Sequence, residues 1–190
     1  MNNEAKFFDK KAEIDYKVLD DDDYLKVLKL HFPELFNKNM KILEIGCGCG
    51  AFGRHFKGKV KGIEISPKLA KKANNFFPCV LGDIRHLPFA DKSFDIIFSG
   101  FVLHHVVNDI SKVVKECKRV LKNKGKIFLI EPNAKSLFEE MQRFRNPKGY
   151  SKEERAITVN ELRKWFKDFD CEFTVEHYTY RVQKNIRLYK

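Results

Sequence analysis

The stretch Lys41–Gly53, KILEIGCGCGAFG, decides the fold of this chain. Ile42, Leu43 and Ile45 form a short apolar run that is typical of a strand buried on both faces, and glycines at positions 46, 48 and 50 end it. A glycine turn lets backbone N–H groups approach a ligand closely, because no Cβ stands in the way. The stretch therefore predicts a strand that leads into a cofactor site.

Strands and helices alternate after this stretch, as apolar runs and helical periodicity follow one another. The expected strands are 42–45, 60–65, 79–81, 94–99 and 126–130, and the expected helices are 51–56, 67–76, 109–122 and 158–169. One extended segment, 171–182, follows, with 185–189 as a weaker candidate for its partner, so the C-terminal strand pair is incomplete in this interpretation. The order predicts an α/β fold with a doubly wound, mostly parallel Rossmann-like sheet of about six to seven strands and helices on both faces.

The 190 residues have the length of a single domain. Residues 1–39 are expected to be a helical appendage, 41–133 the cofactor-binding core, and 158–190 the final helix and C-terminal strand. Residues 134–157 are polar and contain Pro147 and Gly149, which indicates a lid or substrate region. Thr158 and Glu161 have the spacing of a capping box for the last helix.

Composition narrows the class of protein. A formal net charge of +11 favours anionic partners, but no basic block with interleaved aromatic residues indicates specific nucleic-acid binding. The five cysteines are scattered and form no C-x-x-C pair, which predicts reduced thiols in a cytoplasmic protein and no metal site. No apolar run is long enough to span a membrane.

The glycine turn alone leaves the cofactor open. Gly46-x-Gly48-x-x-Ala51, with Glu64 18 residues after Gly46, also fits the fingerprint of a dinucleotide-binding oxidoreductase. Further features favour another nucleoside: the acid Glu44 inside the first strand, Gly82-Asp83 after the third, and a histidine pair after the fourth. Open α/β sheets bind ligands at the carboxyl ends of their strands, where these groups are expected.

The motifs ILEIGCGCG, GIEIS, GDIRHLPF, FDIIFSGFVLHHV and LKNKGKIFLIEPN, in this order, resemble those of class I S-adenosylmethionine-dependent methyltransferases. The likeness covers 41–133 and is greatest for the small-molecule branch that includes quinone-biosynthesis enzymes. It implies S-adenosyl-L-methionine as cofactor and S-adenosyl-L-homocysteine as product. Glu64 would bind the ribose and Asp83 the adenine amine. The implied cofactor-binding residues are Glu44, Gly46, Cys47, Gly48, Gly50, Glu64, Ile65, Asp83, Ile84, Ser99 and Phe101.

His104 and His105 are the candidate general bases, because histidine titrates near neutral pH. Adjacent residues cannot both point the same way, so at most one is expected to face a substrate, and His104 is slightly favoured over His105. The alternative is a structural histidine under the lid. Glu131, at the end of the fifth strand, is expected to orient a histidine or to bind substrate.

The expected acceptor is a small molecule, partly apolar and anionic, because the lid combines aromatic and basic residues (Phe138, Met141, Arg143, Phe144 and Arg145). RNA or protein methylation, and a partner subunit that binds the cofactor without catalysis, are the alternatives. The sequence leaves monomer and homodimer open.

Overall fold

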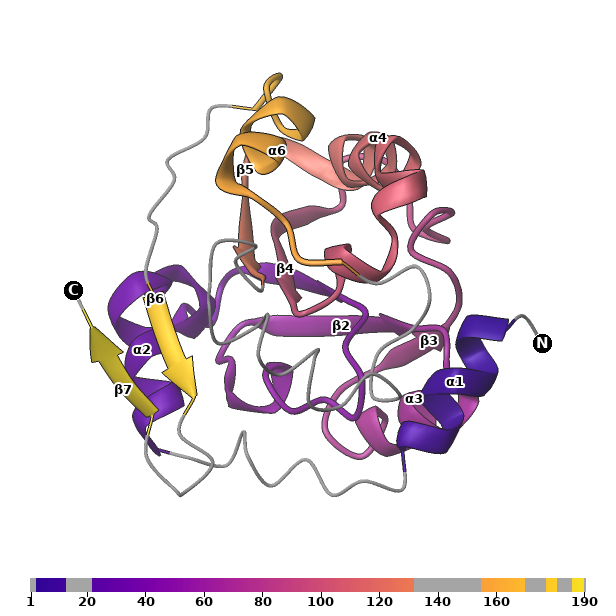
Figure 1. Cartoon of the computed structure of the whole chain (residues 1–190), viewed down its shortest axis with the longest axis horizontal. Coiled ribbons are helices and arrows are strands. Elements are labelled where there is room, and N and C mark those ends of the chain that lie inside the picture. Colours follow the sequence, from indigo (N-terminus) through magenta and orange to yellow (C-terminus); the bar gives the residue numbers. More distant parts are fainter. Residues whose placement is uncertain (1–2, 13–21, 132–154, 170–176, 181–185, 190) are drawn as a thin grey trace. The chain divides into compact units, whose positions relative to one another are not determined.

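The computed structural model describes residues 3–12, 22–131, 155–169, 177–180 and 186–189 (Figure 1). The chain divides into two compact units. The first comprises residues 1–100 and 115–130, and the second residues 101–114 and 131–190. Each unit is described by itself. The predicted division into appendage, core, lid and C-terminal part of one domain stays a prediction.

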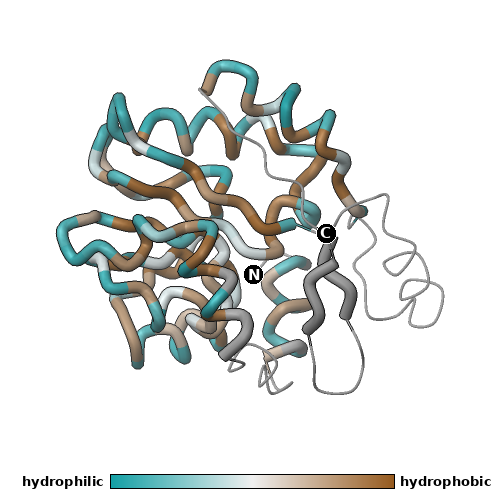
Figure 2. Tube along the Cα trace, turned by 90° about the vertical axis from the view of Figure 1, so that its left-hand side faces the viewer, coloured by the Kyte–Doolittle hydropathy of each residue, from teal (hydrophilic) through white to brown (hydrophobic). Residues whose placement is uncertain are grey.

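A parallel sheet of five strands forms the first unit, in the order β3-β2-β1-β4-β5. Its strands are β1 (Lys41–Ile45), β2 (Lys59–Glu64), β3 (Cys79–Leu81), β4 (Phe94–Gly100) and β5 (Leu121–Ile130). Ile42, Leu43 and Ile45 of the central strand β1 are almost fully buried, as the apolar run predicts. Figure 2 shows hydrophobic residues along the buried strands. The sheet order brings the carboxyl ends of β1, β2 and β3 side by side.

The first unit also contains helices and 3₁₀ turns. They are α1 (Asn3–Lys11), α2 (Asp22–His31), the 3₁₀ turns η2 (Pro33–Phe36) and η3 (Gly53–His55), and α3 (Pro67–Ala73). The hydroxyl of Ser66 caps α3 by accepting from the N–H of Leu69 at 3.2 Å, with Pro67 in the first turn, as predicted. α3 contacts β2 and β3, and α1 contacts α3.

Phenylalanine rings fill much of the core below the sheet. Phe98 of β4 is fully buried, and the rings of Phe52, Phe56 and Phe32 lie 5.3, 5.0 and 6.4 Å from it. The Phe56 and Phe32 contacts are edge-on, the geometry that aromatic pairs prefer. This cluster fixes the strand that precedes the histidine pair.

The irregular segment after β3 is tied to helix α4 (Ile110–Val120) by two side chains. The Arg119 guanidinium donates to the carbonyls of Leu87 (2.8 Å) and Phe89 (2.7 Å), while the Glu116 carboxylate accepts from the N–H of Leu87 at 2.7 Å. Backbone groups that pair in no strand are thereby satisfied.

The second unit holds the 3₁₀ turns η4 (Leu103–His105) and η5 (Val107–Asp109), helix α6 (Val159–Trp165), and an antiparallel pair of β6 (His177–Tyr180) and β7 (Ile186–Tyr189). Thr158 and Glu161 form the predicted capping box on α6. The lid residues at positions 138, 141 and 143–145 lie outside the described residues, as does most of the segment 171–182.

Four predicted helices need correction, and the one expected over 67–76 ends at Ala73. The helix expected over 51–56 is the short turn η3, because the preceding glycines adopt left-handed conformations. The helix expected over 109–122 ends at Val120, since Leu121 already pairs with Phe94 and β5 then bulges before Lys126 pairs with Ile96. The helix expected over 158–169 ends at Trp165.

The predicted sheet of six to seven strands is not confirmed. The main sheet has five strands in the described part of the chain, and β6 and β7 pair with each other as a separate sheet. The strand that residues 185–189 weakly indicated is present as β7.

Candidate cofactor and active site

The glycine turn after β1 has the backbone geometry that its sequence predicts. Gly46, Gly48 and Gly50 have φ values of +60°, +56° and +83°, which side chains with a Cβ rarely adopt. The N–H of Gly48 donates to Glu64 Oε2 at 2.9 Å. A Cβ added at Gly48 would meet no atom of the described residues within 4 Å, so this part of the chain leaves open space there.

Glu64, the last residue of β2, is held by backbone donors. Besides Gly48, the N–H of Ser66 donates to Glu64 Oε1 at 2.8 Å, and the residue is 5% exposed. Burial raises the pKa of Glu64, and these backbone hydrogen bonds oppose the rise. Each carboxylate oxygen has two lone pairs, so Glu64 retains capacity to accept from two hydroxyl groups.

Glu44 lies within β1 and is fully enclosed. Its Oε2 is buried and makes no hydrogen bond to a described residue, and the same is true of Ser99 Oγ on β4. Burial raises the pKa of Glu44 well above its ordinary value, which favours the protonated carboxyl. A Cβ at Gly53 would lie 2.2 Å from Glu44 Oε2, so the turn packs directly on this acid.

Asp83 follows β3, and the Arg85 side chain binds both of its carboxylate oxygens. The Nε of Arg85 lies 2.9 Å from both carboxylate oxygens of Asp83, and its Nη2 lies 2.7 Å from Oδ2. Burial disfavours the ionised form, but the hydrogen bonds and charge of Arg85 outweigh it and lower the pKa of Asp83. Ile65 is partly buried, and Ile84 is buried.

Helix α1 contacts the residues that follow β2 and β3. Glu4 Oε2 lies 2.6 Å from Arg85 Nη2, and Asp9 Oδ1 accepts from the Ser66 hydroxyl and, at 3.2 Å, from the N–H of Lys68. Sequence reasoning missed these contacts. The available signal was Arg85 itself, two residues after Asp83 in the GDIRHLPF motif, whereas nothing local marks Glu4 or Asp9 as its neighbours.

Glu131 organises the histidine turn of the second unit. Its Oε1 accepts from the N–H groups of Val102 (3.0 Å) and Leu103 (2.8 Å), and its Oε2 lies 2.8 Å from Nδ1 of His104. The side chains of His104 and Glu131 are 5% and 3% exposed. This contact holds the His104 ring, and the role of Glu131 in the site stays a prediction.

Two neighbours of His104 complete this turn. The rings of His104 and His105 have centroids 4.0 Å apart and are tilted by 40°. Phe101 has a φ of +60°, a strained value for a residue with a bulky side chain, and its side chain is partly exposed. Strain of this kind is often found at ligand sites. The roles of His104, His105, Phe101 and Ser99 stay predictions.

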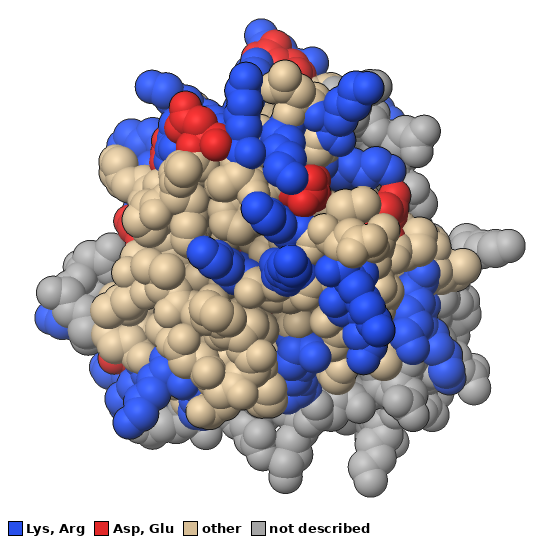
Figure 3. All heavy atoms as spheres, turned by 180° about the vertical axis from the view of Figure 1, so that it is seen from behind, with Lys and Arg blue, Asp and Glu red and all other residues tan. Residues whose placement is uncertain are grey.

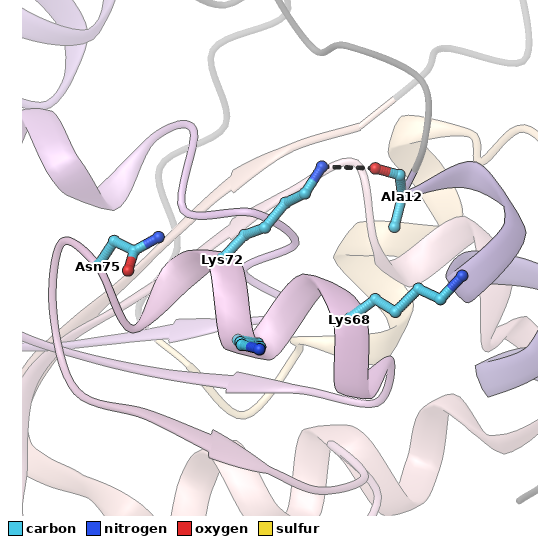
Figure 4. A pocket seen from close by; sticks show the side chains of 5 residues that line it. Ala12, Lys68, Lys72 and Asn75 are labelled. Atoms are coloured by element: carbon cyan, nitrogen blue, oxygen red, sulfur yellow. Dashed lines mark hydrogen bonds between the residues drawn. The ribbon is translucent and has the colours of Figure 1, made fainter.

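A pocket of about 390 Å³ lies beside α3 (Figure 4). In the figure Lys72 reaches toward the end of α1, where its Nζ donates to the carbonyl of Ala12 at 2.6 Å. The lining residues are Ala12, Lys68, Lys71, Lys72 and Asn75. Since no residue predicted to bind the cofactor lines it, this pocket is not the predicted site.

Basic side chains dominate one face of the protein. Lys and Arg far outnumber Asp and Glu on the face seen in Figure 3. In the described ranges, no three His, Cys, Asp or Glu side chains gather as a metal site, and no helix there is long and apolar enough to cross a membrane. That the whole protein has no metal site therefore stays a prediction.

Comparison with known proteins agrees with this geometry. Residues 43–129 match the methyltransferase domain family. Demethylmenaquinone methyltransferase of Thermotoga maritima is 34% identical over 106 residues, which are 50% of this chain and 46% of that protein. The chain spans about half the length of the curated relatives that it matches.

Solved structures share the fold. A methyltransferase of T. maritima, described as a possible histamine N-methyltransferase, has a TM-score of 0.71 and 21% identity, covering 96% of this chain and 91% of its own. Phosphoethanolamine N-methyltransferase 2 of Haemonchus contortus, solved with S-adenosylhomocysteine, has a TM-score of 0.70 and 18% identity, covering 88% and 44%. Residues 43–129 thus match a methyltransferase domain, and the solved structures show that the chain shares the fold of such enzymes.

Proposed function

We propose that this protein transfers the methyl group of S-adenosyl-L-methionine to a small-molecule acceptor and releases S-adenosyl-L-homocysteine. The observation that carries the proposal is the glycine turn whose Gly48 N–H is held by Glu64 at 2.9 Å, with open space at the Gly48 Cβ position. When bound, S-adenosyl-L-methionine supplies an electrophilic methyl group on a sulfonium.

The residues present suit such a cofactor. The left-handed glycines expose backbone to a ligand, and Glu64 can accept hydrogen bonds from two ribose hydroxyls besides its backbone donors. The buried Glu44 Oε2 and Ser99 Oγ are polar atoms that no described residue satisfies. Asp83 would bind an adenine amine once Arg85 releases one of its oxygens.

The histidine turn suits proton transfer. If Nδ1 of His104 donates to Glu131 Oε2, then Nε2 carries the lone pair and can accept a proton. The nearby carboxylate would stabilise the imidazolium that results. Glu131 would therefore act as a positioning residue for His104 in reactions whose acceptor starts as a hydroxyl, a protonated amine or a carbon acid.

The proposed acceptor is a small molecule because the relative from T. maritima is named for a quinone precursor, demethylmenaquinone. RNA is the second candidate, because the net charge is +11 and Lys and Arg dominate the face in Figure 3. Incubation with radiolabelled S-adenosyl-L-methionine and fractionated cell extract distinguishes them, since label in the organic extract supports the proposal and label in RNA contradicts it.

Cofactor binding is tested by calorimetry with S-adenosyl-L-homocysteine and with NAD. We expect the first to bind and the second not to. Gly48→Ala should weaken binding by about ten-fold or more, which is about 1.4 kcal/mol, because its Cβ would fill the ligand's space. The free energy of unfolding of Gly48→Ala should also fall by about 1–2 kcal/mol, because alanine disfavours the left-handed conformation.

Gly50→Ala is the matched control, because it has a similar φ but its Cβ would lie 3.2 Å from the Phe77 ring and 3.3 Å from Ala73. It should therefore lose more stability than Gly48→Ala. Wild-type protein that binds NAD instead, or a Gly48→Ala variant with unchanged affinity, would contradict the proposal.

A further inference from the structure

Two thiols meet at the glycine turn. Cys47, the second residue of the turn, has its Sγ 3.4 Å from the Sγ of Cys79, the first residue of β3. Both sulfurs belong to one cluster with Ala73 and Phe77, in which Cys47 is 5% exposed and Cys79 is partly exposed. The pair therefore joins the predicted cofactor turn to β3, across the intervening strand β2.

Gly62 on β2 makes room for this pair. Its Cα pairs with that of Cys79 in the sheet, and a Cβ at Gly62 would lie 2.7 Å from Cys47 Sγ and 2.8 Å from the Phe77 ring. Any larger residue would push the Cys47 sulfur away. The glycine turn, β2 and β3 therefore all contribute to the close approach of the two thiols.

We propose that Cys47 and Cys79 form a reversible disulfide under peroxide and that this bond weakens cofactor binding. This proposal rests on the proposed function only for its effect on binding. A disulfide has an S–S length of about 2.05 Å, so the sulfurs need to approach by about 1.4 Å.

The chemistry balances with hydrogen peroxide as oxidant. The Cys79 thiolate attacks one peroxide oxygen, forming a sulfenic acid and, with a proton, one water. The Cys47 sulfur then attacks the Cys79 sulfur, forming the S–S bond as the hydroxyl leaves with the Cys47 proton as a second water. The contact with the Cys47 sulfur lowers the pKa of the Cys79 thiol, which suits Cys79 to the first step.

The bond would act on the turn through the Cys47 backbone. Its N–H donates to the carbonyl of Ile63 at 3.1 Å, and its carbonyl accepts from the N–H of Gly50 at 2.9 Å. Pulling the Cys47 side chain toward β3 shifts both peptide groups next to Gly48. The oxidised turn should therefore present its N–H groups less well to the cofactor.

The test treats the full chain with hydrogen peroxide, then measures disulfide-linked peptides by mass spectrometry and S-adenosyl-L-homocysteine affinity by calorimetry. Trypsin places Cys47 and Cys49 together in residues 42–54 and Cys79 in residues 73–85, so fragment spectra and a Cys49→Ser variant assign the linkage. We expect a 47–79 link and an affinity about ten-fold lower that dithiothreitol restores.

Two variants serve as controls. Cys79→Ser should keep its affinity under peroxide, whereas Cys117→Ala, which removes a thiol buried on α4, should respond as the wild type does. A missing link, a link through Cys49, or a link that leaves the affinity unchanged would overturn the proposal. If the reduced protein binds no S-adenosyl-L-homocysteine, the proposed function and the effect on binding fail together, while the peptide map still decides the disulfide.

Discussion

Glu64 and Asp83 follow neighbouring strands of one sheet, yet the protein holds them in different ways. Glu64 is 5% exposed and is bound by two backbone N–H groups, whereas Asp83 is more exposed and is bound mainly by one side chain, Arg85. Backbone donors cannot leave without unfolding the turn, but a guanidinium can swing away. The difference teaches that the ribose end of the predicted site is preformed, while the adenine end is occupied by the chain.

The largest expected effect comes from Glu64→Gln. Glutamine keeps one oxygen but places an NH₂ group against the N–H of either Gly48 or Ser66, so one backbone donor is left unsatisfied. We expect a loss of about 1.5–3 kcal/mol in the free energy of unfolding, measured by chemical denaturation, together with weaker S-adenosyl-L-homocysteine binding.

Glu34→Gln is the control for this change. Glu34 pairs with Lys126 on the surface at 2.6 Å, and such pairs contribute about 1 kcal/mol or less. Equal losses in both variants would show that the backbone contacts of Glu64 add nothing beyond a surface pair.

The buried carboxyl of Glu44 should make the stability of the protein depend on pH. Its pKa is raised by burial, so above its ordinary value of 4.5 the folded state holds a proton that the unfolded state releases. Stability from this group is therefore present below pH 4.5 and declines as pH rises toward the folded pKa. Glu44→Gln cannot ionise. Denaturation across pH 5–8 should show a flatter profile for the variant, and an unchanged slope would contradict the raised pKa.

The smallest effects are expected at Asp83. Its pKa is lowered, so its stabilising contribution is present above its ordinary value of 3.8 and is lost as pH falls through the folded pKa. Near pH 7, Asp83→Asn should cost about 1 kcal/mol or less, because the pair is partly exposed.

Binding separates the two members of this pair. Asp83→Asn should weaken S-adenosyl-L-homocysteine binding several-fold, because it removes a charged acceptor, whereas Arg85→Ala should leave it unchanged or tighten it, because the Asp83 oxygens are released. Calorimetry measures both. Equal weakening in the two variants would mean that Asp83 and Arg85 act on the cofactor as a unit.

The sequence predicts the strands well, because short apolar runs that end in glycine or an acid leave few other structures. The glycine turn and the contact of Glu131 with the histidine turn followed from the same reasoning. Capping at Ser66 and Thr158 was also predictable, since the cap and its partner lie within three residues.

Most of the features that the sequence did not predict depend on contacts between residues that are far apart in the chain. The residues of α1 gain their partners Ser66, Lys68 and Arg85 more than fifty positions away. Helix α4 stops at Val120 because Leu121 finds Phe94, a pairing that no local pattern indicates. The 3₁₀ turn in place of a helix after Gly50 follows from the left-handed conformations of the preceding glycines.

The strand order has a consequence for amide hydrogen exchange. β1 has a neighbour on each side, so its amide protons should exchange with solvent only when the sheet opens as a whole. β3 has three residues and, in the described part of the chain, one neighbour, so local opening suffices there. The glycine turn is thus anchored to a strand whose amides should exchange slowly, and Asp83 to a strand that should open locally.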